Sequence, residues 1–203
     1  MTTPILTDVH VTGPRALLRP VRAADAALAF PLLHGQRAVL DWLVWQGPAD
    51  EGELRERYTV WRAAGGAGWN YQLAVVERAS ERFAGTLTLR CLGHPSALDL
   101  GYWLGAELHG RGLGTDAVLL ATRLAVGPLA ARVVTAEVFV GNHASARVLE
   151  KVGFTREAQR ATRPLDGAPG RADRARWMYS LAAAAWRDPG PPADGWEVSV
   201  AVE

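Results

Sequence analysis

Three glycines at alternate positions, Gly110, Gly112 and Gly114, stand in the stretch HGRGLGTDA at residues 109–117. Glycine loses more conformational freedom on folding than other residues, so this cluster indicates a backbone that must approach something closely. A strand-like pattern precedes the stretch and a helical pattern follows it. The first turn of a helix offers unpaired N–H groups and partial positive charge, and glycines let a loop curl around phosphate oxygens. The pattern therefore indicates either a pyrophosphate site or a tight strand-to-helix turn that needs positive φ angles.

The neighbouring residues narrow the choice of phosphate ligand. A nucleoside-triphosphate loop carries Lys and then Ser or Thr after its last glycine, whereas Thr115 and Asp116 follow Gly114 here. A dinucleotide site competes better, because residues 112–117 match G-x-G-x-x-A and Glu137 follows about 20 residues later, where an acid would bind a ribose. However, three strand patterns in succession before the loop, and a single strand–helix unit after it, do not suit a doubly wound parallel sheet.

The patterns around the loop predict the elements that position it. Alternating or β-branched runs predict strands over residues 15–21, 69–77, 82–92, 98–105, 132–140 and 176–181. Apolar residues at helical spacing, with glycine stops, predict helices over residues 23–35, 50–66, 113–127 and 142–154. In the strand over 82–92, Phe83, Leu87 and Leu89 should share one buried face. The order of these elements predicts an α/β fold with a mixed sheet and helices on both faces.

Composition sets the class of protein. Of the 203 residues, 49% are apolar and 21% charged, as in an ordinary soluble globular domain. The formal net charge of +1 gives no reason to expect a nucleic-acid partner, and the single cysteine, Cys91, excludes an internal disulfide. Neither a secretory signal nor an apolar run long enough to span a membrane is found, so we expect no membrane partner and a cytoplasmic location.

The C-terminal residues predict an appendage to the domain. Residues 188–195 read DPGPPADG, which is typical of a linker, and strict alternation over 196–203 predicts a last strand. A lone strand must pair with the edge of this sheet or with a second subunit, which would give a homodimer. We expect residues 1–187 to form a single domain and residues 188–203 to form the linker and strand.

At this point the sequence resembles a known family. LGYWLGAELHGRGLGTDAVLLA, from Leu100, and RVVTAEVFVGNHASARVLEKVGFTREA, from Arg132, are similar to the acetyl-CoA-binding half of GCN5-related N-acetyltransferases (GNAT). The likeness covers residues 15–187 and is strongest to the ribosomal-protein-alanine N-acetyltransferases. It implies a GNAT fold, whose mostly antiparallel twisted sheet is splayed in the middle. It also implies an enzyme that moves an acetyl group from acetyl-CoA to a primary amine by direct attack, with no metal.

The resemblance assigns residues to the acetyl-CoA site. Main-chain N–H groups of the glycine loop would hold the pyrophosphate, and the N–H of Leu104 would polarise the acetyl carbonyl as in an oxyanion hole. His109 departs from the Gln or Arg that begins the family loop, although an imidazole can still donate to a phosphate. The expected cofactor-binding residues are Leu104, His109, Gly110, Arg111, Gly112, Leu113, Gly114, Thr115, Asn142 and Ser145.

The resemblance also suggests catalytic groups. Ser145 is the candidate proton donor to the CoA thiolate, since Leu149 replaces the tyrosine that many relatives use. A base must take a proton from the amine. Glu137 is the first candidate, and Asp99, Asp41 and His143 are further candidates. A surface or turn position is the stronger interpretation for each of the candidate bases. Ser145 could equally pack near the cofactor, and Asn142 could be a helix cap.

The acceptor side is the least defined. Trp42 and Trp45 lie between the first two predicted helices and would form an apolar floor for a peptide N-terminus or a small-molecule amine, unless both pack in the core. Two other functions stay open from sequence alone. One is a non-catalytic acyl-CoA-binding module of the same fold, and the other is the dinucleotide-binding enzyme considered above.

Overall fold

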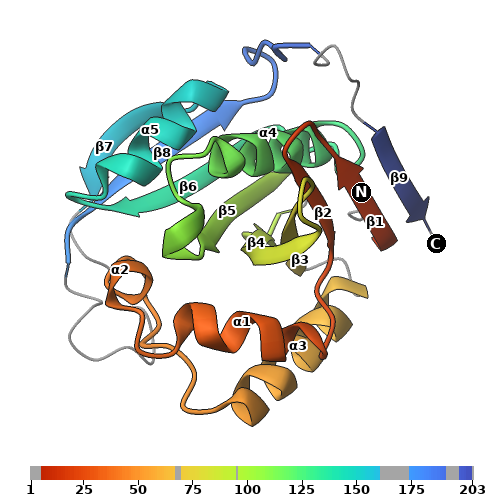
Figure 1. Cartoon of the computed structure of the whole chain (residues 1–203). Coiled ribbons are helices and arrows are strands. Elements are labelled where there is room, and N and C mark those ends of the chain that lie inside the picture. Colours follow the sequence, from red (N-terminus) through yellow and green to blue (C-terminus); the bar gives the residue numbers. More distant parts are fainter. Residues whose placement is uncertain (1–5, 67–69, 95, 161–173, 191–196, 203) are drawn as a thin grey trace.

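One sheet runs through the computed structural model, which describes residues 6–66, 70–94, 96–160, 174–190 and 197–202 (Figure 1). Its nine described strands lie in the order β7-β8-β6-β5-β4-β3-β2-β1-β9. The strands are β1 (Leu6–Thr12), β2 (Ala16–Pro20), β3 (Asn70–Glu77), β4 (Arg82–Cys91), β5 (Ala97–Leu104), β6 (Val133–Phe139), β7 (Thr155–Arg160), β8 (Arg176–Ala182) and β9 (Glu197–Val202). The helices are α1 (Asp25–Leu33), α2 (Arg37–Leu40), α3 (Glu51–Gly66), α4 (Leu113–Val126) and α5 (His143–Val152), with a 3₁₀ turn over Ala106–Leu108.

The sheet opens in its middle. Neighbouring strands pair antiparallel except β5 and β6, which are parallel and pair only from Ala97 to Asp99 on β5. Beyond Asp99 the two strands diverge, while β5 stays paired with β4 as far as Leu104. The predicted mixed, mostly antiparallel and splayed sheet is confirmed. The splay leaves the β6 side of Leu100–Leu104 without a described ladder partner.

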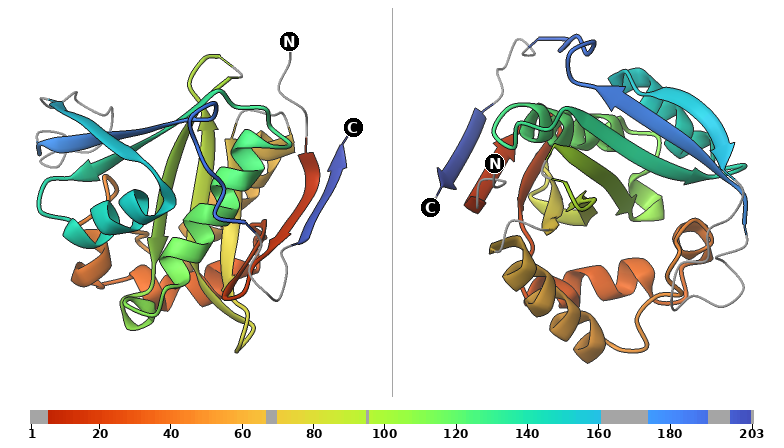
Figure 2. Two further views of the ribbon diagram at one scale, coloured as in Figure 1. Left: turned by 90° about the horizontal axis from the view of Figure 1, so that it is seen from above. Right: turned by 180° about the vertical axis from the view of Figure 1, so that it is seen from behind.

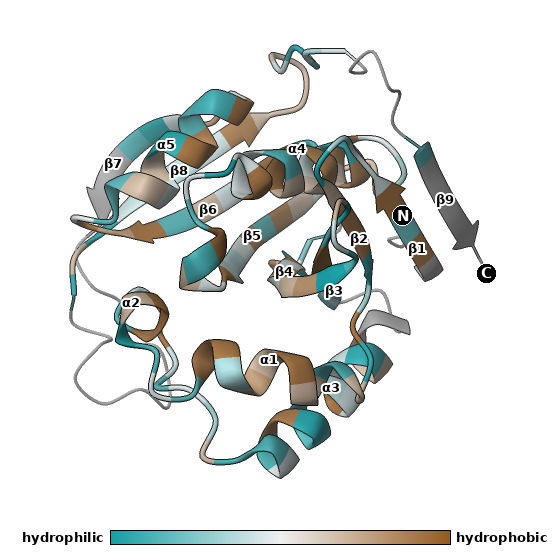
Figure 3. Ribbon diagram, viewed as in Figure 1, coloured by the Kyte–Doolittle hydropathy of each residue, from teal (hydrophilic) through white to brown (hydrophobic). Residues whose placement is uncertain are grey.

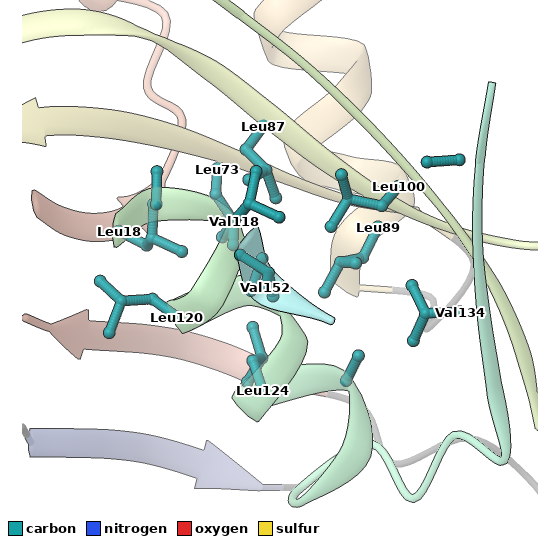
Figure 4. Packing of buried hydrophobic residues seen from close by; sticks show 14 of the residues in the cluster. Leu18, Leu73, Leu87, Leu89, Leu100, Val118, Leu120, Leu124, Val134 and Val152 are labelled. Atoms are coloured by element: carbon teal, nitrogen blue, oxygen red, sulfur yellow. The ribbon is translucent and has the colours of Figure 1, made fainter. Parts of the chain in front are cut away.

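Helices cover both faces of the sheet, as predicted. Helices α4 and α5 lie on one face, and α1 and α3 lie on the other (Figures 1 and 2). On the α4 face, Leu18, Leu73 and Leu87 from three strands gather beside Val118 of α4 (Figure 4). A second buried cluster joins α1, α2 and α3 to the opposite face of the sheet. Figure 3 shows the corresponding polarity, with α1 largely hydrophobic and much of α3 hydrophilic.

The predicted burial of β4 is wrong in two respects. Ala84 and Thr86 are buried as well as Leu87, because helices cover both faces of this strand. Phe83 does not share a face with Leu87: it packs in the cluster around α1, whereas Leu87 packs against α4. The cause is a β-bulge, in which Val75 pairs with Gly85 but the next residue of β3 pairs with Phe83, so the alternation shifts by one. Simple alternation along the sequence cannot reveal such a shift.

Three elements of the structure were not predicted from the sequence. Strand β1 was not expected, and neither were β7 and the short helix α2. The predicted C-terminal strand exists as β9, and it pairs antiparallel with β1 of the same chain, from Leu6–Val202 to Thr12–Glu197. All views place β9 beside β1 at one edge of the sheet (Figure 2). Among the described residues, no helix has the length and apolar character needed to cross a bilayer.

A buried carboxylate ties α4 to the turn between β1 and β2. Asp116, in the first turn of α4, is 7% exposed, and its Oδ2 accepts hydrogen bonds from the main-chain N–H groups of Arg15 and Ala16, both at 2.8 Å. The turn approaches so closely that a Cβ on Gly13 would lie 2.8 Å from Asp116 Oδ2. This contact fixes the start of α4, and therefore the glycine-rich loop before it, against the sheet.

We expect Asp116→Ala to lower the free energy of unfolding by about 3 kcal/mol, because the buried N–H of Ala16 and the partly buried N–H of Arg15 lose their acceptor. Urea unfolding followed by circular dichroism measures this loss. The matched control is Asp50→Ala, which removes the exposed cap at the start of α3, where Asp50 Oδ1 accepts from the Glu53 N–H at 2.8 Å. That change should cost about 1 kcal/mol. Equal losses in the two variants would contradict an anchoring role for Asp116.

Candidate functional site

A cavity of about 330 Å³ lies where β5 and β6 diverge. Its walls come from the splayed half of β5, the C-terminal half of β6, the glycine-rich loop before α4, the first turns of α5, and α2 with the residues after it. The cavity brings together predicted site residues that are far apart in sequence. Those lining it are Trp42, Leu104, His109, Gly110, Gly112, Gly114, Thr115, Glu137, Asn142 and Ser145.

Three predicted site residues lie outside this lining. Leu113 is buried in the core cluster under α4. Arg111 is exposed and forms an ion pair with Glu77 at 2.8 Å. Trp45 packs against the cluster around α1, with the guanidinium carbon of Arg57 lying 4.5 Å from the centre of its ring.

The glycine-rich loop has the geometry of an anion site. Gly110 and Gly112 have φ angles of 75° and 80°, in the left-handed region that favours glycine. Gly112 is the N-cap of α4, and no side chain caps it. The first-turn N–H groups of α4 therefore stand beside the cavity without a side-chain cap, at the positive end of the helix dipole.

His109 turns toward the sheet. Its Nε2 lies 3.0 Å from the carbonyl oxygen of Leu104. Because a carbonyl can only accept, His109 must carry a hydrogen on Nε2 and donate it. The sequence had suggested this imidazole as a phosphate donor, and in this structure it instead closes the end of β5.

The main chain of Leu104 faces the divergence. Successive N–H groups along a strand point to opposite sides, and the Gly105 N–H donates to Ala84 of β4 at 2.9 Å. We therefore infer that the N–H of Leu104 points away from β4, toward β6. This is the orientation that an oxyanion donor in the cavity requires.

Two polar groups begin α5 beside the cavity. Asn142 is the N-cap, and its Oδ1 accepts from the Ser145 N–H at 3.1 Å. The Ser145 hydroxyl lies 3.0 Å from the hydroxyl of Tyr102 on β5, which also lines the cavity. Burial raises the pKa of Tyr102 to about 12, so this phenol is neutral near pH 7.

The other end of the cavity combines charge with aromatic rings. Glu137 Oε2 pairs with Arg176 at 2.5 Å, and the Arg176 side chain is only 6% exposed. Arg174 lies between two rings, with its guanidinium carbon 4.5 Å from the centre of Phe139 and 5.4 Å from that of Trp42. This end therefore offers one carboxylate, held by a buried cation, beside an aromatic surface.

The other candidate bases do not line the cavity. Asp99 pairs with Arg90 at 2.5 Å, and burial raises the pKa of Asp99. Asp41 forms an exposed ion pair with Arg37 at 3.2 Å, and His143 packs against Trp177 with ring centres 5.5 Å apart.

Sequence reasoning missed four residues that bear on the site. Arg147 and Lys151 of α5 both line the cavity, and their four-residue spacing on a predicted helix was the available signal. Arg15 reaches the loop, since its Nε lies 3.3 Å from where a Cβ on Gly112 would stand. Tyr102 is the fourth, and only the fold brings it to Ser145.

Solved structures share this fold at low sequence identity. RimJ from Mycobacterium smegmatis, solved in complex with CoA-disulfide, matches with a TM-score of 0.75 and 22% identity, over 92% of this chain and 90% of that chain. A GNAT-family acetyltransferase from Bacillus anthracis matches with a TM-score of 0.72 and 15% identity, over 86% and 99% of the two chains. The ribosomal-protein-S5-alanine acetyltransferase from Vibrio fischeri matches with a TM-score of 0.72 and 17% identity, over 88% and 98%.

Sequence comparison gives the family. No curated protein matches the chain. The family model described as an acetyltransferase (GNAT) domain matches residues 15–155, which include the glycine-rich loop, β5, β6 and α5. With the splayed sheet and the cavity at its centre, this match shows that the chain belongs to the GNAT family of acetyltransferases.

Proposed function

We propose that this protein transfers an acetyl group from acetyl-CoA to a primary amine, and that the amine is the N-terminus of a protein or peptide. The observation that carries the proposal is the cavity at the splay, which is lined by the glycine-rich loop, by Leu104 and by Glu137. Acetyl-CoA in this cavity would place its phosphates at the glycine-rich loop, the donor end. The amine would bind near Glu137, the acceptor end.

The residues at the donor end suit CoA. The uncapped first turn of α4 supplies main-chain donors for a pyrophosphate, as in other helix N-termini that bind phosphates. Arg15 beside Gly112, and Arg147 and Lys151 on α5, supply cations for the remaining phosphate charge. Asn142 would orient the pantetheine arm through its side-chain amide, while its Oδ1 accepts from the Ser145 N–H.

The residues at the acceptor end, around Glu137, suit an amine that has an apolar side chain next to it. Glu137 has one oxygen engaged by Arg176, which leaves the other for an ammonium group or its proton. Trp42 is 36% exposed and lines the cavity, so an apolar side chain next to the amine can pack on it. RimJ and a ribosomal-protein-S5-alanine acetyltransferase share the fold, which supports a protein N-terminus as the first acceptor class to test.

The proposed reaction uses direct attack. Glu137 takes a proton from the ammonium, and the free amine attacks the acetyl carbonyl. The N–H of Leu104 donates to the carbonyl oxygen as it becomes anionic. As the new C–N bond forms, the C–S bond breaks and its electron pair goes to sulfur. The nitrogen loses its second proton to solvent, and the Ser145 hydroxyl donates a hydrogen bond to the thiolate.

An acetylation assay tests the function. Purified protein is mixed with acetyl-CoA and a panel of N-terminal peptides, polyamines and free amino acids, and CoA release is followed with a thiol reagent. We expect release for peptides with a small first residue, with one acetyl group added at the α-amine by mass spectrometry. CoA binding by calorimetry with no release for any acceptor would instead support a non-catalytic acyl-CoA module. Stabilisation by NAD and not by CoA would support a dinucleotide enzyme.

Glu137→Gln tests the proposed base. We expect kcat to fall about 100-fold, since a positioned base typically contributes this much or more, while the Kd for CoA stays unchanged. Asp99→Asn is the matched control, because Asp99 is also a strand carboxylate paired with an arginine but lies outside the cavity lining. Its kcat should match that of the unaltered protein. An unchanged kcat in Glu137→Gln would assign the proton transfer elsewhere.

Gly112→Ala tests the anion site. A side chain in the left-handed region costs about 1 kcal/mol of stability, and the added Cβ would also crowd Arg15 beside the cavity. We expect the Kd for CoA to rise about 10-fold, measured by calorimetry, because the loop N–H groups shift. Gly93→Ala is the control, since Gly93 has a similar φ of 79° with open space around it, outside the cavity lining. It should lose similar stability and keep its affinity for CoA.

A further inference from the structure

Tyr102 places a hydroxyl group at the wall of the cavity. It stands two residues before Leu104 on the splayed half of β5, and its ring packs against the core cluster under α4. The neighbouring Trp103 faces the other side of the sheet, where it packs near Phe83. Tyr102 lines the cavity, so a ring held by the core carries its polar end to the site.

The hydroxyl of Tyr102 meets that of Ser145. The two oxygens are 3.0 Å apart and join β5 to α5 across the cavity wall. Ser145 is fixed at its main chain, where its N–H donates to Asn142, but a serine hydroxyl can rotate about its own bond. The two hydroxyls carry two hydrogens, and the bond between them uses one. The pair therefore has one O–H left to offer to a ligand.

The direction of the hydrogen bond follows from the acidity of the two groups. A phenol is more acidic than an alcohol, so it is the better donor and the poorer acceptor. Burial raises the pKa of Tyr102 to about 12, so the phenol keeps its hydrogen near neutral pH. Either hydroxyl could donate across this contact. The acidity favours Tyr102 as the donor to Ser145 Oγ, which leaves the O–H of Ser145 for a ligand.

We propose that Tyr102 is a positioning residue for acyl transfer, whose hydroxyl fixes the rotation of the Ser145 hydroxyl so that Ser145 donates to the departing sulfur of CoA. This inference rests on the proposed function. Tyr102 gives up no proton in the step. The ammonium loses one proton to Glu137, the C–N bond forms and the C–S bond breaks, and the nitrogen loses its second proton to solvent. The sulfur leaves as a thiolate that solvent protonates after release.

Three variants test the proposal: Tyr102→Phe, Ser145→Ala and the double variant. Tyr102→Phe keeps the ring and removes only the hydroxyl. Each single change should lower kcat about 10-fold, the effect of losing one hydrogen bond to a charged group. The double variant should fall no further than Ser145→Ala, since both changes remove the same interaction. The Kd for CoA should stay within about twofold of the starting value in all three.

A second readout does not need an acceptor. The thiolate of bound CoA is titrated by its ultraviolet absorbance, and a donated hydrogen bond should lower the thiol pKa relative to free CoA. Tyr102→Phe and Ser145→Ala should both return the thiol pKa toward that of free CoA. The matched control is Tyr179→Phe, because Tyr179 is also buried and donates to Glu150 at 3.0 Å, but outside the cavity lining. It should change neither the thiol pKa nor kcat.

The results separate this inference from the proposed function. A Tyr102→Phe protein with the original thiol pKa and kcat would overturn the positioning role, and so would a double variant in which the two losses multiply. Bound CoA with an ordinary thiol pKa in the unaltered protein would also overturn it. If the unaltered protein acetylates no acceptor but lowers the thiol pKa, and Tyr102→Phe abolishes that effect, the positioning role stands and the proposed turnover fails.

Discussion

The divergence of β5 from β6 after Asp99 is the constraint on which the site depends. Inside a sheet, each main-chain N–H and C=O normally has a partner on the neighbouring strand, and a buried group without one is costly. Past Asp99, β5 loses that partner on one side only, because β4 still pairs with it as far as Leu104. The opening thus exposes a short row of main-chain groups to a cavity while the strand itself stays rigid. A ligand that supplies the missing hydrogen bonds can therefore pair with this side of β5 without first rearranging the strand.

Side chains compensate part of the loss along this open edge. His109 donates to the Leu104 carbonyl at 3.0 Å, so one acceptor is satisfied from within the chain. Tyr102 and Ser145 form a second bridge, from β5 to the start of α5. Asp116 holds the helix that follows the loop against the turn between β1 and β2. These contacts fix the walls of the cavity independently of any ligand, which favours binding without a large ordering cost.

The features that sequence predicted well are those with local causes. The glycine-rich loop, the helix after it and the Asn142 cap follow from backbone conformation and unpaired helix ends, which neighbouring residues determine. The features that sequence missed depend on contacts between distant segments. Phe83 changed face because of a bulge, and β1 pairs on one side with β2 and on the other with β9, two strands that are far apart in the chain. The contact of Tyr102 with Ser145 requires both the splay and the docking of α5.

His109 shows how a departure from a family motif can be accommodated. A Gln or Arg at this position could donate to a phosphate, but the imidazole is turned to the end of β5. The anion site then relies on main-chain donors of α4 and on cations from outside the motif, Arg15 on the β1–β2 side and Arg147 and Lys151 on α5. His109 instead holds the carbonyl of Leu104, which lies five residues before it in the chain. The residue whose N–H faces the cavity is therefore fixed from its carbonyl side, so position 109 bears on the oxyanion donor and not directly on the phosphates.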